Sequence, residues 1–162
     1  MTLPFSPESD ARAFRNALGR FVTGVTLVTV ATDQGPVGFA ANSFTSVSMD
    51  PPLVLWCPAK SSSRFHHYEH ARHYAIHVLS AAQAALLPRF ARGGAGFEGL
   101  AHEVNPEGVP VLPAALARFD CDRFAVHDAG DHLIIVGRVL RATMAEGDPL
   151  AFGMGRYGGF AG

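Results

Sequence analysis

The sequence predicts a mainly β protein, built as an antiparallel barrel or sandwich with a few covering helices. Three observations indicate this class: segments of strand character outnumber helical ones, most neighbouring strands are joined by short turns, and no regular alternation of strand and helix appears. The 162 residues, 48% hydrophobic and 17% charged, suffice to bury a core without disulfides or metal. We therefore expect one folded domain over residues 1–162.

The first predicted element is a short helix. Residues 6–8, Ser-Pro-Glu, combine a capping residue, a proline suited to the first helical position and an acidic first turn. Apolar residues then follow at helical spacing: Phe14, Ala17, Leu18 and Phe21. We expect this helix to lie across the body of the domain and to end near Gly24.

Strand signals fill the next part of the chain. Residues 25–30 are rich in β-branched side chains, and a turn sequence separates them from residues 36–40, so the two runs predict a hairpin. Residues 43–48 and 53–57 predict two further strands. The intervening Asp50-Pro51-Pro52 must lie outside a central ladder, because proline cannot donate to it.

The middle of the chain mixes helix, strand and loop. Residues 62–71 have a helical pattern, residues 74–79 predict a strand, and residues 81–87 favour a helix whose end is disrupted or kinked by Pro88. The glycines of residues 93–96 predict a mobile loop.

Two long strands complete the predicted body. Residues 105–113 are proline-rich and predict an irregular segment, whereas residues 117–127 and 132–143 predict strands joined by a turn at residues 128–131. Residues 153–159 are too rich in glycine to predict a stable element of their own.

Composition argues against several classes of function. The formal net charge is −1 and the pI is about 6.7, so no broad basic field exists for nucleic acid or a membrane surface. No apolar stretch is long enough to span a bilayer, and residues 1–10 lack the pattern of a signal peptide. Two cysteines are too few for a disulfide framework. We therefore expect a soluble, cytoplasmic protein that grips any anion locally.

The run from Gly38 to Ser48 is a candidate binding segment. Its small residues let a flat ligand approach the backbone, and Asn42 with the neighbouring hydroxyls supplies hydrogen-bonding groups. The same pattern also fits an edge strand whose polar residues face water. Spacing alone leaves both interpretations open.

Residues 60–64, Lys-Ser-Ser-Ser-Arg, are a candidate phosphate site. They combine two cations and three hydroxyls with the free N–H groups of a predicted helix start. Alternatively, Ser61 or Ser62 only caps the helix and the cations are solvated. The chain has no Walker loop and no Gly-x-Gly-x-x-Gly after a strand, which disfavours nucleotide binding on a doubly wound sheet.

Histidines and cysteines give weaker signals. On a helix, His66, His70 and His73 would share one face, but zinc-protease spacing is missing and we assign no metal. His132 begins a hydrophobic strand, where its imidazole either enters a cleft or belongs to a turn. The two cysteines, Cys57 and Cys121, are flanked by apolar residues and are interpreted as core members.

Seven short segments follow one another in a recognisable order over almost the whole chain. They are Phe14-Arg15 with residues 21–26, residues 35–44, residues 46–54, Val78-Leu79-Ser80 with Gln83, Arg89-Phe90-Ala91, Gly130-Asp131-His132 and Gly155-Arg156-Tyr157. Together they resemble the flavin reductase-like family, the small reductase components of two-component flavin-dependent monooxygenases. The resemblance implies the fold of that family, an antiparallel Greek-key split β-barrel that binds FMN.

The resemblance also implies site residues. In the family, the segment matching residues 39–43 lies beside the isoalloxazine ring and bonds it largely through backbone groups, and residues matching 57–63 hold the ribityl chain and phosphate. His132, assigned as catalytic, and Tyr157 match positions near the nicotinamide. The cofactor-binding residues implied are Phe39, Ala40, Ala41, Asn42, Ser43, Ser48, Cys57, Pro58, Lys60, Ser61, Ser63, Phe90, Ala91, Arg156 and Tyr157.

The activity that the resemblance implies is hydride transfer from C4 of NADH or NADPH to N5 of FMN or FAD. Reduced flavin then passes to a separate oxygenase. Family members are homodimers with flavin near the subunit interface, so we expect a homodimer. The alternatives are a flavin-binding or electron-carrying split-barrel protein without efficient NAD(P)H oxidation, and a metal-binding protein that uses His66, His70 and His73.

Overall fold

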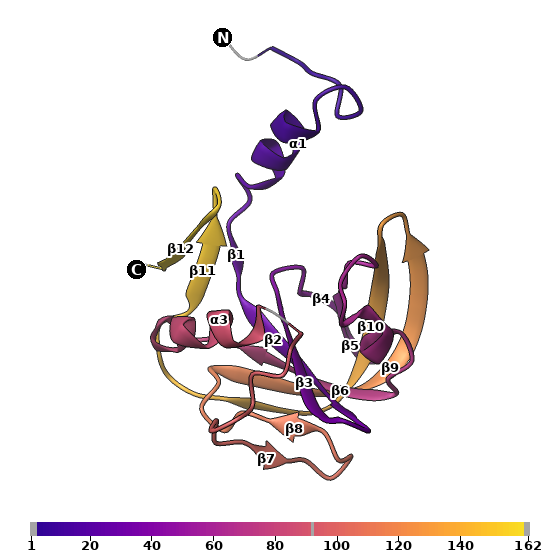
Figure 1. Ribbon diagram of the computed structural model, residues 1–162, viewed down its shortest axis with the longest axis vertical. Helices are drawn as coiled ribbons and strands as arrows, with labels where there is room; N and C mark the ends of the chain where they lie inside the picture. The colour runs from indigo at the N-terminus through magenta and orange to yellow at the C-terminus, as the bar shows by residue number, and fades with distance from the viewer. Residues whose placement is uncertain (1–2, 92, 161–162) are drawn as a thin grey trace.

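The computed structural model describes residues 3–91 and 93–160, and its architecture is mainly antiparallel β-structure, as predicted (Figure 1). The helices are α1 (Ala11–Leu18), α2 (Phe65–Glu69), the 3₁₀ helix η1 (Ala81–Leu86) and α3 (Leu87–Phe90). The strands are β1 (Thr23–Gly24), β2 (Thr26–Thr32), β3 (Gly35–Ala41), β4 (Thr45–Met49), β5 (Pro52–Trp56), β6 (His73–Val78), β7 (Glu103–Val104), β8 (Pro110–Val111), β9 (Ala117–Ala129), β10 (His132–Met144), β11 (Leu150–Gly153) and β12 (Arg156–Gly159).

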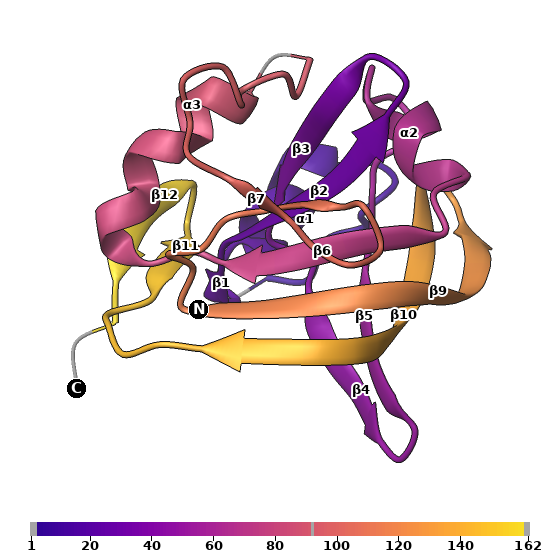
Figure 2. The ribbon, with the colours of Figure 1, turned by 90° about the horizontal axis from the view of Figure 1, so that it is seen from below.

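A seven-stranded sheet forms the body, in the order β3-β2-β6-β9-β10-β5-β4, with every neighbour antiparallel. The long strands β9 and β10 bend at two register shifts, which lets the sheet curl around its core. One bend lies at Gly137, where a Cβ atom would collide with the buried Tyr74 hydroxyl. Figure 2 shows the curved sheet and the β4–β5 hairpin projecting from it.

Two large apolar clusters fill the interior, together with a small third one made of Ala75, Val109 and Val111. The larger one lies inside the curled sheet around Trp56, whose ring contacts Tyr68 edge-on at 5.0 Å between centroids, with Phe39 packed against both rings. The second cluster lies beneath η1 and α3 and is centred on the fully buried Phe90. The hairpin predicted for residues 25–40 is confirmed and carries residues of both clusters, so it ties the two parts of the core together.

Helix α1 differs from the prediction in its start, its end and its position. Asp10, not Ser6, caps the helix by accepting from the Ala13 amide at 2.9 Å, and the helix ends at Leu18 instead of near Gly24. It does not lie across the body: it extends away from the sheet, and none of its residues is buried (Figure 1). The apolar spacing was read correctly, but Phe14 and Leu18 remain 43% and 58% exposed.

Two further predictions need correction. Helix α2 begins at Phe65, and neither Ser61 nor Ser62 caps it, because Arg64 occupies the cap position. Residues 81–86 form a 3₁₀ helix that continues into α3, so Pro88 falls in the first turn of a new helix. The glycine loop contacts β3 at one point, where the Gly38 amide donates to the Gly94 carbonyl at 2.9 Å, and its mobility stays a prediction.

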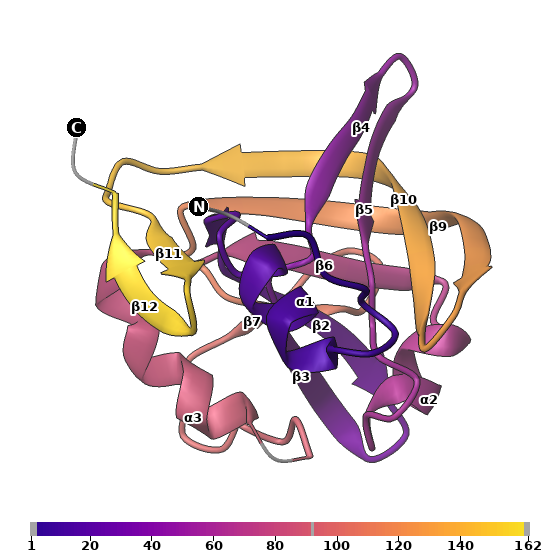
Figure 3. The same cartoon turned by 90° about the horizontal axis from the view of Figure 1, so that it is seen from above.

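The glycine-rich tail also differs from its prediction. Residues 150–159 form strands β11 and β12, and β11 pairs with β1 to make a three-stranded sheet beside the main one (Figure 3). The two-residue turn Met154-Gly155 has positive φ at both positions, which matches the twist of a tight hairpin. Pairing with β1 supplies the stability that composition alone did not indicate.

No helix in residues 3–91 and 93–160 is both long and apolar enough to cross a bilayer.

His77 is the most buried titratable histidine of the fold. Its Nδ1 lies 3.0 Å from the Leu27 carbonyl and its Nε2 accepts from the Leu112 amide at 3.0 Å, so the ring joins β2 and β6 to the segment after β8. Burial lowers the pKa of His77 to about 4; Arg118 also lowers this pKa, while the Leu27 hydrogen bond and Asp120 oppose the shift.

We predict an acid-sensitive stability that originates at His77. Its pKa falls from about 6.5 unfolded to about 4 folded, so the unfolded chain binds more protons between these values. The free energy of unfolding should therefore fall by up to about 3 kcal/mol as the pH drops from about 6.5 to about 4. Denaturant unfolding across this range should show a flatter dependence for His77→Asn. Equal pH slopes for both proteins would contradict this origin.

Candidate functional site

The open edge of β3 is the first component of the candidate site. Strand β3 is the last strand of the main sheet, and within the described residues its one ladder partner is β2. The Gly38 amide points away from β2 because it donates to Gly94. In an antiparallel pair, outward-facing amides recur at every second residue. The N–H and C=O of Ala40 therefore point outward too, where no strand receives them.

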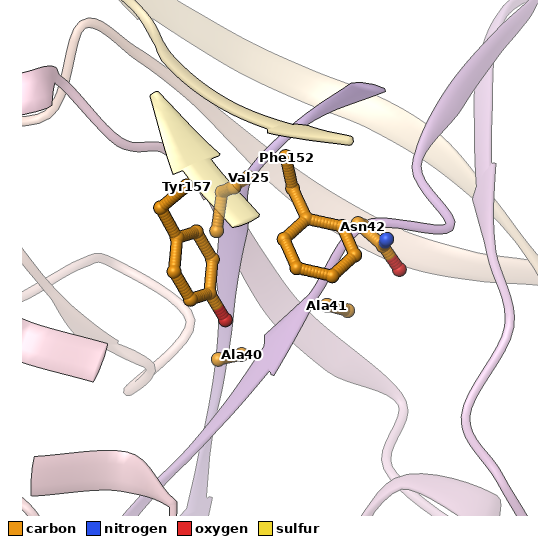
Figure 4. A pocket seen from close by; sticks show the side chains of 6 residues that line it. All are labelled: Val25, Ala40, Ala41, Asn42, Phe152 and Tyr157. Carbon is orange, nitrogen blue, oxygen red and sulfur yellow. The ribbon is translucent and has the colours of Figure 1, made fainter. Parts of the chain in front are cut away.

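A pocket of about 140 Å³ lies against this edge, lined by Val25, Ala40, Ala41, Asn42, Phe152 and Tyr157. Figure 4 shows the Phe152 and Tyr157 rings extending from β11 and β12 over the small side chains of β3. The two ring centroids lie 5.0 Å apart. The pocket thus joins small residues, backbone hydrogen-bonding groups and aromatic surface, the combination that suits a flat conjugated ligand.

The predicted residues Phe90 and Ala91 lie on the far side of Tyr157 with different exposures. Ala91 is exposed and, with Tyr157, Leu87 and Pro88, lines a second hollow of about 310 Å³. Phe90 is fully buried, and its ring occupies the space that a Cβ of Gly38 would need. Of these two, only Ala91 has an exposed side chain; Phe90 packs beneath the β3 edge.

Phe39 has a similar internal role. Its ring packs edge-on against Trp56 and Tyr68, and the Arg64 guanidinium lies over it at 4.3 Å from the centroid. Phe39 therefore belongs to the core side of β3, whereas the backbone that follows it borders the pocket.

A pair of hydrogen bonds connects the β3 edge to the end of β5. The Ser43 hydroxyl accepts from the Cys57 amide at 2.9 Å and donates to the Cys57 carbonyl at 3.2 Å. Burial raises the pKa of the Cys57 thiol, so this cysteine is not an activated nucleophile. Pro58, which follows, is buried, and its carbonyl accepts from the Leu133 amide. These contacts fix the position of the chain immediately before Lys60.

Lys60 is held by the turn between β9 and β10. Its Nζ lies 2.6 Å from Asp128 Oδ2 and 2.7 Å from the Gly130 carbonyl, and its amide donates to the Asp131 carbonyl. The lysine lowers the pKa of the Asp128 carboxyl. Ser61 and Ser63 are exposed beside it. An anion that binds here would meet two hydroxyls and a cation shared with a carboxylate.

His132 lies at this same end of the molecule. An isolated bridge pairs it with Ala59, and its Nδ1 lies 2.7 Å from Asp131 Oδ1. The hydrogen bond to His132 lowers the pKa of the Asp131 carboxyl, whose oxygen accepts from the Nδ1 side of the ring. Nε2 lies on the other side of this half-exposed ring.

The structure does not bring His132 and Tyr157 together within one protomer. The start of β10 and strand β12 lie on opposite sides of the molecule in both Figure 1 and Figure 3. Two other predicted residues also lie apart from the pocket lining. Ser48 pairs with Leu53 near the tip of the projecting β4–β5 hairpin, and Arg156 is exposed at the start of β12.

Sequence analysis missed Phe152 and the role of Arg64. Phe152 precedes the Met154-Gly155 turn by two residues, but its segment was not interpreted as a strand. Arg64 donates to the Phe90 carbonyl and stacks on Phe39, and it also contacts the Ser62 hydroxyl. Burial lowers its pKa. This arginine braces residues 62–64 against the β3 edge instead of facing solvent.

The histidines of residues 66–73 are arranged differently from a metal site. The described residues contain no group of three or more side chains able to hold a metal ion. His73 lies 3.4 Å from Asp122, and His70 lies 3.5 Å from the neighbouring Glu69.

Comparisons with known proteins agree on one family. A family model described as "Flavin reductase like domain" matches residues 18–161. The FMN reductase (NADH) SmoA of Agrobacterium fabrum is 60% identical over 152 residues, which cover 94% of this chain and 87% of that protein. The reductase subunit HsaB of a flavin-dependent monooxygenase from Rhodococcus jostii is 41% identical, covering 93% and 78%.

Solved structures give the same result. The NADH:FAD oxidoreductase SgcE6 of Streptomyces globisporus aligns with a TM-score of 0.91 at 34% identity, covering 100% of this chain and 94% of that chain. A second structure of SgcE6, in complex with NAD and FAD fragments, aligns with a TM-score of 0.90 at 34% identity, covering 99% and 98%.

We predict that Ser43 stabilises the connection between β3 and β5. Ser43→Ala removes both hydrogen bonds to Cys57 and leaves its half-buried amide without this partner, which should lower the free energy of unfolding by about 1–2 kcal/mol. Denaturant titration measures the change. Ser46→Ala, at an exposed position of β4, is the matched control and should change stability by less than about 0.5 kcal/mol. Equal effects from both variants would rule out a special role for the Ser43 hydroxyl.

Proposed function

The chain belongs to the flavin reductase-like family, and we propose that it oxidises NADH or NADPH and transfers the hydride to FMN or FAD. The observation that carries this proposal is the pocket at the open edge of β3, where outward backbone groups of Ala40 face the rings of Phe152 and Tyr157. NADH and FMN, named for the relative at 60% identity, form the pair that we expect to react fastest.

The residues of the pocket fit an isoalloxazine ring. Ala40 and Ala41 have side chains small enough for a planar ring to approach the backbone, and the outward Ala40 amide offers a donor to a ring edge that gains negative charge on reduction. When bound, the flavin supplies the hydride acceptor. The protein's own task is to orient the two rings and to exclude water between them.

The opposite end of the flavin would lie along residues 57–63. Ser61 and Ser63 carry exposed hydroxyls, and Lys60 carries the cation, so we assign the phosphate to these three residues. The Ser43–Cys57 hydrogen bonds support this assignment because they make the path from the β3 edge to Lys60 continuous. We retain Asn42, Pro58 and Ala91 as neighbours of the same ligand.

We propose that the active unit is a homodimer. The apolar face of α1 is left uncovered, and its members are Phe14, Leu18, Phe21 and Val22 with the adjoining chain. An eight-residue helix is not stable alone in water, so its apolar face requires a covering surface. Exposed apolar residues on β4, β9 and β10 offer one on a second copy: Val47, Met49, Phe124, Val126, Leu140 and Met144.

Dimer formation would also allow His132 of one copy to lie near Tyr157 of the other. With the two residues on opposite sides of one protomer, a nicotinamide site that uses both needs one from each copy. We therefore propose that His132 of one copy serves the pocket at Tyr157 of the other, with Nε2 positioned to accept a hydrogen bond from the nicotinamide carboxamide.

Three broader properties follow from the same proposal. Relatives named as monooxygenase reductase subunits support a separate oxygenase that receives the reduced flavin. The family match over residues 18–161 supports one domain over residues 1–162. The free thiols of Cys57 and Cys121 support a reducing, cytoplasmic location.

Turnover with the four combinations of NADH or NADPH and FMN or FAD tests the activity. We expect continuous nicotinamide oxidation with at least one combination, fastest with NADH and FMN, and rapid anaerobic bleaching of bound flavin. Yellow protein that bleaches only slowly would instead indicate a flavin carrier without efficient NAD(P)H oxidation. Absence of turnover with all four combinations contradicts the reductase assignment.

We predict that the apolar face of α1 holds the dimer together. Phe14→Asp with Leu18→Asp places two charges on this face and should shift the mass in light scattering from twice 17.2 kDa towards 17.2 kDa. The control is Asn16→Asp, which adds a charge to the polar face of the same helix and should leave the mass at the dimer value. A dimer that survives both changes, or a monomeric wild type, would refute this interface.

A further inference from the structure

Another pocket, of about 430 Å³ and distinct from the hollow at Ala91, lies between α1 and the β11–β12 turn. Its lining consists of Arg15, Asn16, Gly19, Arg20, Phe152, Met154 and Gly155. Hydrogen bonding fixes the two walls together, because the Met154 amide donates to the Gly19 carbonyl at 2.7 Å. No carboxylate lines the pocket, and its polar charged groups are two arginines.

Helix α1 turns its polar face towards the rest of the protein, although the polar face of a surface helix is normally exposed. The residues that line the pocket come from its polar side, while Phe14 and Leu18 point away and remain exposed. A surface helix usually does the opposite and buries its apolar stripe against its own domain. The arrangement places arginines against the β11–β12 turn, and it needs an explanation beyond packing.

Arg15 and Arg20 lack the carboxylate or backbone-carbonyl partners that six other arginines of the described residues have, and Arg12 and Arg138 lack them too. Arg72, Arg118 and Arg141 pair with carboxylates, and three others donate to backbone carbonyls: Arg64, Arg89 and Arg123. Within the part of the chain that the structure describes, Arg15 has no side-chain partner, and Arg20 reaches only the Met154 sulfur, at 3.6 Å. Arg156, which likewise has no carboxylate partner among the described residues, follows Gly155 at the pocket rim.

The helix end itself does not repel an anion strongly, because its last carbonyls are occupied. The carbonyls of Arg15, Ala17 and Leu18 accept from the amides of Gly19, Arg20 and Phe21. The pocket therefore presents guanidinium groups with free donors, and guanidinium matches the geometry of phosphate oxygens.

Phe152 lines both this pocket and the pocket at the β3 edge, so the two are adjacent. We propose that the arginine pocket of α1 and the β11–β12 turn binds the pyrophosphate of the ADP half of the nicotinamide dinucleotide. This inference rests on the proposed function. It gives helix α1 a role in donor binding besides its proposed role in dimer formation. It also assigns Arg15 and Arg20 as determinants of the affinity for NADH or NADPH.

FAD and the nicotinamide dinucleotide both carry an ADP half, so the experiment must separate them. We assign the FMN phosphate to Lys60, past Ser43 and Cys57, and the ADP half of FAD would continue from that phosphate. The nicotinamide dinucleotide, stacked near Tyr157, has phosphates of its own, and Phe152 joins the pocket at Tyr157 to the arginine pocket.

The test compares NADH with reduced nicotinamide mononucleotide, which lacks the ADP half. For Arg15→Gln with Arg20→Gln, we expect the KM for NADH to rise about tenfold at low salt, because two charge-assisted contacts are lost. The KM for the reduced mononucleotide should change by less than about twofold, since that donor does not reach the arginines. NADPH, which carries the same pyrophosphate and an additional 2′-phosphate, should also show a raised KM.

The control variant is Arg72→Gln. It removes the same charge from an exposed arginine beside Asp122, in the segment between α2 and β6, and should keep the KM for NADH at the wild-type value. A second measurement needs no variant: ADP-ribose should compete with NADH in the wild type, and calorimetry should detect its binding there but not in the double variant.

Several results would overturn the inference. One is an unchanged KM for NADH in the double variant, and another is an equal rise in KM for NADH and for the reduced mononucleotide. A rise in KM for FAD alone would assign the pocket to FAD instead. Failure of the proposed function is recognisable separately, because the wild type would then oxidise no donor. ADP-ribose binding by calorimetry would still decide whether the arginine pocket takes this half of the molecule.

Discussion

The interaction on which this structure depends is the hydrogen bond from the Gly38 amide to the Gly94 carbonyl. It closes one end of the exposed β3 edge with the glycine loop, and the alternation of an antiparallel strand then leaves the outward groups of Ala40 open two residues further on. Exposed edges invite pairing with other chains, and proteins normally cover them. Here the rings of Phe152 and Tyr157 stand over the open part, so a ligand can use it while another strand cannot.

In the proposed dimer, helix α1 would link the chemistry of the site to the assembly of the protein. Its apolar residues are exposed, where we propose that a second copy covers them, whereas its arginine face lines the pocket beside Phe152. One short element would thus contribute both to the interface and to donor binding. The opposite placement of His132 and Tyr157 makes the same demand on assembly, because neither side of a single protomer holds all the proposed groups.

Much of the fold follows from local sequence pattern. The β2–β3 hairpin and the long β9–β10 pair were predictable because β-branched runs flank turn residues at the right spacing. The position of α1 was not predictable, because an apolar stripe on a helix does not show which surface packs against it. The β11–β12 hairpin was missed because its stability comes from pairing with β1, and the hydrogen bond between Gly38 and the glycine loop was not predictable because the two residues are distant in sequence.

The candidate site was predictable to a similar extent. Ala40, Ala41, Asn42 and Tyr157 do line one pocket, although they were assigned by resemblance and not by spacing. The phosphate prediction relied partly on a helix start at Ser61 or Ser62, which the structure places at Phe65. Arg64 acts through a long-range contact with Phe39 that no local pattern encodes, and Phe152 contacts Tyr157 in a hairpin that the glycine-rich sequence did not indicate.

The Ala40 amide offers the most direct measurement of the central claim. In a titration of isotope-labelled protein with riboflavin, followed by amide resonances and hydrogen exchange, we expect Ala40 to shift strongly and to become protected, while Gly38 stays unchanged because Gly94 already holds it. An Ala40 amide that is protected before any ligand is added, or one that riboflavin leaves untouched, would contradict an open β3 edge as the place where the ring binds.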